Sequence, residues 1–259
     1  MNTYKTSEIA HCIGIHPNTV RLYEELELIP KPERKVNGYR VFTDFHIEQF
    51  KLARTALKVE VLQNGLRKQA ISIIKASASK DFDRAIFLTE HYLQQIKREQ
   101  RNAEEAITIT RRLLSGENQK MSNVIYTRKE TADYLQITMD ALRNWEMNGL
   151  LTVKRKENGY RVYADEDVRR LKIIRSLRCA NYSLTAILRM LNALTNDPET
   201  DIREVIETPK ENDDIISVCD KLLTSLQYAE KNAKLMLLHL DKIKKQFSPD
   251  TTLYTNSEL

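Results

Sequence analysis

The residues of this 259-residue chain with the clearest chemical potential lie in a short stretch that occurs twice. Residues 37–42 read Asn-Gly-Tyr-Arg-Val-Phe, and residues 158–163 read Asn-Gly-Tyr-Arg-Val-Tyr. Asn-Gly favours a tight turn, because both residue types tolerate a positive φ. The arginine can hold a phosphate through two parallel hydrogen bonds, and the tyrosine before it adds a ring with a polar tip. Each copy is therefore typical of the tip and outgoing strand of a small β-wing.

A helix-turn-helix pattern must position each wing. In the first copy, residues 6–13 predict a short amphipathic helix that Gly14 ends. His16 and Pro17 then start a second helix, with His16 as its cap and Pro17 at its first position. A helix, a tight turn with glycine and a second helix are the spacing of a helix-turn-helix.

Two further helices are predicted behind the first wing, at 44–57 and around 66–75. The same order returns in residues 124–195, at an offset of 122 residues before the wing and 121 after it. The residue lost from the second copy lies between the strands of its wing, where loops tolerate deletions. The chain therefore carries two modules of one design.

Charge is distributed unevenly between these modules and the rest of the chain. Residues 1–80 and residues 124–195 each hold 13 Lys/Arg against 8 Asp/Glu. Residues 81–123 are balanced, whereas residues 196–259 hold 13 Asp/Glu against 8 Lys/Arg. Two basic modules on neutral-to-acidic connectors suit a polyanionic partner. From charge alone, two solvated surfaces with a slight excess of lysine remain the alternative.

The composition predicts a soluble, helix-rich protein, with 41% hydrophobic and 30% charged residues and 6 each of Gly and Pro. The sequence contains neither a long apolar run nor a signal-peptide pattern, so we expect a cytoplasmic protein with no membrane partner. Cys12, Cys179 and Cys219 are too scattered for a disulfide framework.

A long amphipathic segment follows each module. Apolar positions alternate in steps of four and three through residues 82–114 and again through residues 215–247, as in a coiled coil. A pair of ordinary core helices is the alternative. The expected seam includes Leu93, Ile96, Ile107, Leu222, Leu226, Met236 and Leu240.

These patterns predict a division of the chain into seven parts. They are a first winged helix-turn-helix head at 1–80, its long helix at 81–115, a linker at 116–123, a second head at 124–195, an acidic connector at 196–213, a second long helix at 214–247 and a disordered tail at 248–259.

Together these features resemble the MerR family of transcription regulators. The resemblance rests on the helix-turn-helix, on an arginine followed by an aromatic residue and a glutamate in its second helix (Arg21 and Arg143), on the Gly-Tyr-Arg wing and on the long helix. It covers residues 3–115 and 125–247. An ordinary member of this family has one such core and a separate effector-binding domain, whereas this chain has two cores and no sizeable further domain.

The resemblance implies a mainly α fold, in which the second helix of each motif enters the major groove of double-stranded DNA, the wings contact the backbone and the two long helices form an antiparallel coiled coil. The implied groove-facing residues are Pro17, Asn18, Thr19, Arg21 and Tyr23 in the first head, and Met139, Asp140, Arg143 and Trp145 in the second. The implied wing contacts are Arg34, Lys35, Tyr39, Arg40, Lys154, Arg155, Lys156, Tyr160 and Arg161. Core packing is the alternative for Tyr23 and Trp145.

The two heads differ at the start of the expected recognition helix. Asn18 is replaced by Asp140, and Thr19 is replaced by Ala141. An aspartate near DNA is repelled by phosphate or accepts a hydrogen bond from a cytosine amine. We therefore predict an asymmetric operator with unlike half-sites.

One chain could reproduce the two-fold dimer of the family. The linker of about eight residues reaches at most roughly 25–28 Å, which can lead from the end of the first long helix into the second head if the helices are antiparallel. This pairing also sets Ala233 against Ile96 and Leu226 against Ala103, large residues against small ones. We favour such a monomeric pseudo-dimer, and a homodimer is the alternative.

The resemblance further implies an activator that underwinds a promoter with a long spacer and so acts on RNA polymerase indirectly. The alternatives are a homodimeric, ligand-responsive regulator of the multidrug type and an architectural or recombination accessory protein that bends DNA. The space around the acidic connector could hold a small-molecule effector. We expect no cofactor or metal, because Cys219 fits a buried seam position. We expect no enzyme, because the sequence lacks a glycine-rich phosphate loop, a nucleophile elbow and an HExxH motif.

Overall fold

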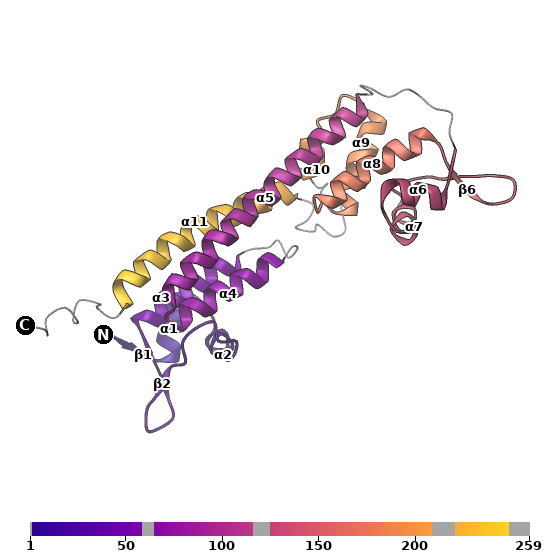
Figure 1. Cartoon of the computed structure of the whole chain (residues 1–259). Coiled ribbons are helices and arrows are strands. Elements are labelled where there is room, and N and C mark those ends of the chain that lie inside the picture. The colour runs from indigo at the N-terminus through magenta and orange to yellow at the C-terminus, as the bar shows by residue number, and fades with distance from the viewer. Residues whose placement is uncertain (1, 59–64, 116–124, 209–220, 249–259) are drawn as a thin grey trace, which may run out of the picture. The chain divides into compact units, whose positions relative to one another are not determined.

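The computed structural model describes residues 2–58, 65–115, 125–208 and 221–248. The chain divides into two units, one made of residues 1–97 with 227–259 and the other of residues 98–226. Each unit holds one head (Figure 1).

The first head begins with β1 (Thr3–Tyr4), α1 (Thr6–Ile13) and α2 (Pro17–Glu25). Gly14 ends α1 in the left-handed conformation, with a φ of +69°. The His16 side chain caps α2 by accepting a hydrogen bond from the N–H of Asn18 at 3.2 Å. The predicted helix-turn-helix, with its glycine and its histidine cap, is confirmed.

The first wing is an antiparallel hairpin of β2 (Glu33–Arg34) and β3 (Arg40–Thr43). A third strand, β1, was not predicted from the sequence; it pairs with β3 and sets Tyr4 opposite Phe42. The helices α3 (Asp44–Leu57) and α4 (Leu66–Ala78) follow. The core of the head lies between α1, α2, β3 and α3 and is formed by Ile9, Ala10, Val20, Ile29, Phe42, Ile47 and Phe50.

Parts of two long helices complete the first unit. They are α5 (Phe82–Leu114), as far as Lys97, and α11 (Leu222–Phe247), from Gln227 onward. Figure 1 shows α11 beside the first half of α5 and next to α3. Lys244 near the end of α11 lies 2.5 Å from Asp83 at the start of α5, so the two helices run in opposite directions within this unit.

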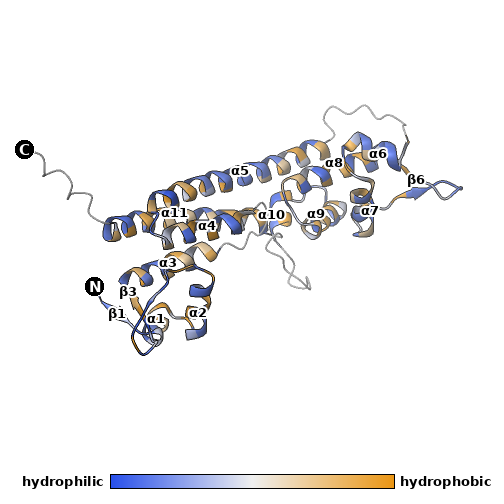
Figure 2. Cartoon of the chain, turned by 60° about the horizontal axis from the view of Figure 1, so that its bottom comes forward, coloured by the Kyte–Doolittle hydropathy of each residue, from blue (hydrophilic) through white to orange (hydrophobic). Residues whose placement is uncertain are grey.

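Buried side chains recur along α5 and α11 at the heptad spacing, and Figure 2 shows hydrophilic and hydrophobic residues alternating along the whole of α5. In α5 the seam positions Ile96 and Ile107 are buried, whereas Leu93 is half-buried and its neighbour Tyr92 is buried instead. In α11 the buried positions at this spacing are Leu222, Leu226, Ala229, Ala233, Met236, Leu240 and Ile243, and Leu223 is buried beside them. The predicted amphipathic pattern of both helices is therefore confirmed.

The second head repeats the order of the first. Its elements are β4 (Tyr126–Thr127), α6 (Arg128–Leu135), α7 (Met139–Met147), β5 (Lys154–Arg155), β6 (Arg161–Tyr163), α8 (Asp165–Cys179) and α9 (Leu184–Asn196). Its sheet has the same strand order, with β6 between β4 and β5. The two heads therefore share one order of helices and strands.

The acidic connector contributes α10 (Ile202–Glu207) to the second unit. The buried guanidinium of Arg189 in α9 donates to the main-chain oxygens of Val205 and Ile206 at 2.9 and 3.0 Å, which satisfies carbonyls at the end of α10. Arg203 and Glu104, 3.3 Å apart, link α10 to the second half of α5.

Several predicted segments lie outside the described residues: the linker 116–123, the end of the connector at 209–213, the first turns of the second long helix at 214–220 with Cys219, and residues 249–259 of the tail. In the part of the chain that is described, no helix has the length and apolar character needed to span a membrane.

Candidate nucleic-acid interface

The two wing turns share one hydrogen-bond pattern. The N–H of Gly38 donates to the Lys35 oxygen at 2.8 Å, and the N–H of Lys35 donates to the Tyr39 oxygen at 2.9 Å; the second wing repeats both bonds at the same distances. Gly38 and its counterpart Gly159 take φ values of +80° and +81°, which residues with a Cβ rarely adopt. The asparagine needs no positive φ, because its side chain instead accepts from the N–H of the following tyrosine.

The wing places most of its predicted contact residues in solvent. Tyr39 and Tyr160 are 71% and 73% exposed, although both are large aromatic residues. The predicted cations Lys35, Lys154, Arg155 and Lys156 are exposed as well. Exposed cations beside an amphipathic ring suit a phosphate backbone, which takes most of its contacts from such side chains.

The arginine of each wing is paired with a glutamate of the recognition helix. Arg40 Nε lies 2.5 Å from Glu24 in α2, and Arg161 Nε lies 2.8 Å from Glu146 in α7. Both carboxylates are largely buried. A charge-assisted bond of this kind holds the wing in one position against the helix. This pairing was not predicted from the sequence, although both glutamates and both arginines recur in the repeat.

The second partner of that glutamate differs between the heads. In the first head, Glu24 also lies 3.5 Å from Arg34 of β2. In the second head, Glu146 accepts a short hydrogen bond from the Tyr163 hydroxyl, and the first head has Phe42 at that position. Burial, together with the bond to Glu146, raises the pKa of Tyr163 well above its usual value, so this hydroxyl stays protonated and donating.

The outward face of each recognition helix carries most of the residues predicted to enter the groove. Asn18 and Arg21 are exposed in α2, where Arg21 donates to Asn18 at 3.2 Å, and Pro17 and Thr19 are half-buried. In α7, Asp140 and Arg143 are exposed. The predicted residue Met139 is exposed as well. Asn144 and Met147, which were not predicted from the sequence, are also exposed and follow Met139 and Arg143 at helical spacing.

Two aromatic residues of the recognition helices face the interior. The Tyr23 ring stacks on Phe50 with centroids 5.3 Å apart and packs against the core of the first head. Trp145 is only 6% exposed. Both positions favour core packing, the alternative to groove contact.

A hollow of about 860 Å³ separates the start of α1, the recognition helix α2 and the first wing. Its lining includes the cations Lys5, Arg21, Lys35 and Arg40, against one carboxylate, Glu8. Glu8 is engaged locally, because it accepts from the N–H of Lys5 at 2.7 Å. Cations that converge on one hollow at a helix start can hold a phosphate group.

The second head has a further arginine at the corresponding place. Arg128 at the start of α6 donates through Nη2 to the main-chain oxygen of Met139 at 2.8 Å, and the first head has Thr6 at this position. The guanidinium therefore lies at the start of α7, immediately before Asp140. This cation was also missed in the sequence analysis.

Metal and effector sites have less support. Within the described ranges, no group of three or more His, Cys, Asp or Glu residues could hold a metal ion. A hollow of about 600 Å³ in the second unit lies between the end of α5 and residues 198–202 of the connector. Asp201, which lines it, is paired with Arg111 at 3.2 Å.

Comparison with known proteins places both heads in one group. Residues 5–42 match the family described as MerR family regulatory protein, and residues 126–194 match MerR HTH family regulatory protein. The chain is 30% identical over 122 residues to the uncharacterised HTH-type transcriptional regulator YyaN of Bacillus subtilis, which covers 43% of this chain and 88% of that protein.

Matches to other named regulators are shorter. The chain is 42% identical over 53 residues to the HTH-type transcriptional regulator CueR of Yersinia pestis, which covers 20% of this chain and 38% of CueR. It is 34% identical over 76 residues to the HTH-type transcriptional regulator ZntR of Escherichia coli, or 29% of this chain and 53% of ZntR. No solved structure matches the chain significantly.

Proposed function

Because the chain belongs to the MerR family, and is therefore a DNA-binding transcription regulator and not an enzyme, we propose that its two heads act together as the two halves of one regulator. Each head occupies one half-site of a double-stranded operator. The helices α2 and α7 read the major groove, and the wings contact the backbone.

The observation that carries this proposal is that each head is contacted by the long helix of the other repeat. The helix α11 follows the second head in sequence, yet His239 Nε2 lies 2.7 Å from Glu48 of the first head. The helix α5 follows the first head, yet Glu99 accepts a hydrogen bond from Asn181 of the second head at 3.4 Å. Two copies of a one-repeat protein would exchange helices in the same way, so one chain can be equivalent to a dimer.

A monomeric pseudo-dimer has a simple test. Its solution mass, measured by light scattering, is expected near 30.2 kDa. A mass twice as large would instead support the homodimer, in which four heads are present.

The heads read different half-sites. Asn18 and Asp140 stand at equivalent exposed positions of the two recognition helices, and one can donate to DNA where the other can only accept or repel. The resulting operator is asymmetric. Footprinting of the full chain is expected to show two protected half-sites of different sequence. Equal occupation of both halves of a perfect palindrome would contradict the proposal.

The regulator acts as an activator that distorts its promoter and influences RNA polymerase indirectly. Support comes from the family and from the length of α5, since a stiff helix can impose a deformation on DNA. Transcription from promoters with a lengthened spacer tests this step: an activator raises transcription from the long spacer, whereas an architectural DNA-bending protein binds without that effect.

The proposed effector is a small molecule that binds in the second unit, in the hollow beside the connector. Two carboxylates, Glu199 and Asp201, line this hollow against one cation, Arg111, and this excess of negative charge favours a cationic compound. The expected result is that such compounds shift the transcriptional response of the wild-type chain and that Asp201→Asn weakens the shift. If a panel of organic cations leaves the transcriptional response of the wild-type chain unchanged, the proposed effector site is contradicted.

A further inference from the structure

We propose that Phe45 and Glu48 of the first head select α11, rather than α5, as the long helix that docks on this head. The inference rests on the proposed pairing of the two repeats within one chain and identifies the residues that decide which helix each head accepts. It is carried by one ionic and one apolar contact, both inside the first unit.

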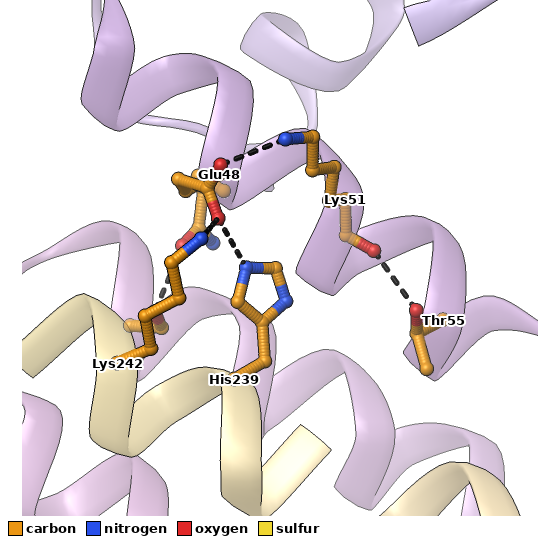
Figure 3. A network of polar contacts seen from close by, with 7 residues as sticks. Glu48, Lys51, Thr55, His239 and Lys242 are labelled. Atoms are coloured by element: carbon orange, nitrogen blue, oxygen red, sulfur yellow. Dashed lines mark hydrogen bonds and ion pairs between the residues drawn. The ribbon is translucent and has the colours of Figure 1, made fainter. Parts of the chain in front are cut away.

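The ionic contact is centred on Glu48 of α3, which is only 9% exposed (Figure 3). Its Oε2 accepts from His239 Nε2 at 2.7 Å and lies 3.4 Å from Lys242 Nζ, and both of these partners belong to α11. Its Oε1 accepts from Lys51 Nζ on its own helix at 2.8 Å. A carboxylate with so little access to water depends on such partners, because an unpaired buried charge is strongly unfavourable.

The apolar contact lies one turn earlier on α3. Phe45 is 3% exposed, and its ring centroid is 5.1 Å from that of Phe247 in α11 and 6.0 Å from that of Phe82 in α5. The Phe45 ring thus joins α3 to the last turn of α11 and, at a larger distance, to the first turn of α5. Phe45 and Glu48 are three residues apart, so they lie on the same face of α3.

The second head has unlike residues at both positions. The repeat aligns Lys51 with Lys172, which sets Glu166 at the position of Phe45 and Arg169 at the position of Glu48. If α11 docked there in the same way, Phe247 would meet a carboxylate, and His239 and Lys242 would meet a guanidinium. Burying a charge against an apolar ring and placing like charges together both oppose this docking.

The helix α5 is in turn a poor match for the first head. The heptads align Ile107 with Leu240, which sets Ala106 at the position of His239 and Ile109 at the position of Lys242. In the second unit, Ala106 and Ile109 line a hollow together with Arg175 of α8, so these residues do face the second head. Docked on the first head, they would leave Glu48 without its α11 partners.

Docking of α11 on the second head and docking of α5 on the first head are therefore both disfavoured, whereas docking of α11 on the first head is stabilised. Attraction in one combination together with repulsion in the other is how related helices choose partners. The selection directs each long helix to the head of the other repeat and opposes association of two chains through like helices.

Hydrogen exchange of the full chain without DNA, followed by mass spectrometry, tests this selection. Glu48→Arg introduces the residue of the second head. The variant is expected to exchange roughly tenfold faster than wild type in the peptide 227–247, with no change in peptides of the second head, because docking contacts protect local structure. Glu90→Arg is the matched control, since it makes the same charge change at an exposed position of α5.

Rescue distinguishes selection from a general packing defect. Adding His239→Glu and Lys242→Glu to Glu48→Arg restores opposite charges and is expected to return the exchange of 227–247 close to the wild-type rate. Failure of this rescue, or exchange no faster than in Glu90→Arg, would overturn the proposal. If Glu48→Arg does not fold, Glu48→Gln replaces it and must show faster exchange in the same peptide.

The outcome does not depend on DNA binding. If the exchange difference and its rescue are observed but footprinting detects no protected operator, the helix selection is supported and the proposed function is contradicted. If the chain protects an asymmetric operator but the exchange difference is absent, the proposed function is supported and the helix selection is contradicted.

Discussion

Arg161 Nε lies 2.8 Å from the Glu146 carboxylate, so the second wing is tied to its recognition helix by a partly buried ion pair. Arg40 and Glu24 form the same link in the first head. Each wing arginine therefore has a protein partner that competes with a DNA phosphate. If the pair braces the wing, removing the glutamate charge weakens DNA binding; if the glutamate mainly withholds the arginine, removing it strengthens binding.

Glu24→Gln is expected to lower affinity for every operator sequence by roughly three- to tenfold, because the wing loses its fixed position on α2. Mobility shifts on operators and on unrelated DNA measure the effect. Glu25→Gln, a neighbouring exposed change on the same helix, serves as the control. A gain in affinity for Glu24→Gln would mean that the freed Arg40 contributes more to phosphate binding than to bracing.

The exposed wing cations are expected to contribute to affinity and not to sequence choice. Lys35→Ala and Lys156→Ala should each weaken binding on all sequences and reduce the slope of log affinity against log salt by about one. Arg21→Ala should instead change the base preference of one half-site, by about 1–3 kcal/mol. If the slope of log affinity against log salt is unchanged in both lysine variants, the wings do not contact the DNA phosphates.

In the second head, the Asp140 carboxylate is expected to lie close to the DNA phosphates of its half-site and to repel them. Asp140→Asn should strengthen binding there several-fold, since it removes repulsion between the carboxylate and nearby phosphates. Arg128→Thr, which introduces the residue of the first head, should weaken it by a similar factor. Binding to operators that carry only the second half-site measures both variants. Equal affinities for both variants and wild type would place this helix start away from DNA.

Acid is expected to destabilise the first unit in two steps. Burial lowers the pKa of His46 from 6.5 to about 4, so between these values the unfolded chain binds a proton that the folded chain does not. Burial alone would raise the pKa of Glu48, but hydrogen bonds from Lys51 and His239 lower it from 4.5 to about 2. In both cases the unfolded state holds more protons, so the free energy of unfolding falls as the pH falls, first from 6.5 to 4 and then from 4.5 to 2.

Urea unfolding followed by circular dichroism between pH 7 and pH 4 measures the first step, which is worth at most about 3 kcal/mol. His46→Gln should flatten the dependence in this range, because glutamine does not titrate there. Fluorescence of Trp145, the one tryptophan of the chain, reports on the second head and serves as an internal comparison. A slope that survives in His46→Gln would assign the acid sensitivity to other groups.

The turns and helix ends of the heads could be predicted from single residue types in the sequence. Gly14, His16 and Pro17 predicted the helix-turn-helix, and the Asn-Gly pairs predicted the wing turns, because these residue types restrict the backbone within a few residues of themselves. The short strand β1 escaped prediction, since two residues carry too little pattern and its partner strand is some 40 residues away.

By itself, the sequence determined that the chain has two heads of one design, two long amphipathic helices and unlike recognition faces. Only the tertiary structure decided that Arg40 and Arg161 are paired with glutamates, that Trp145 faces the core and that α11 docks on the first head. The contact between Glu48 and His239 joins residues 191 positions apart. Such contacts depend on how whole helices dock and rotate against each other, which no local propensity or spacing encodes.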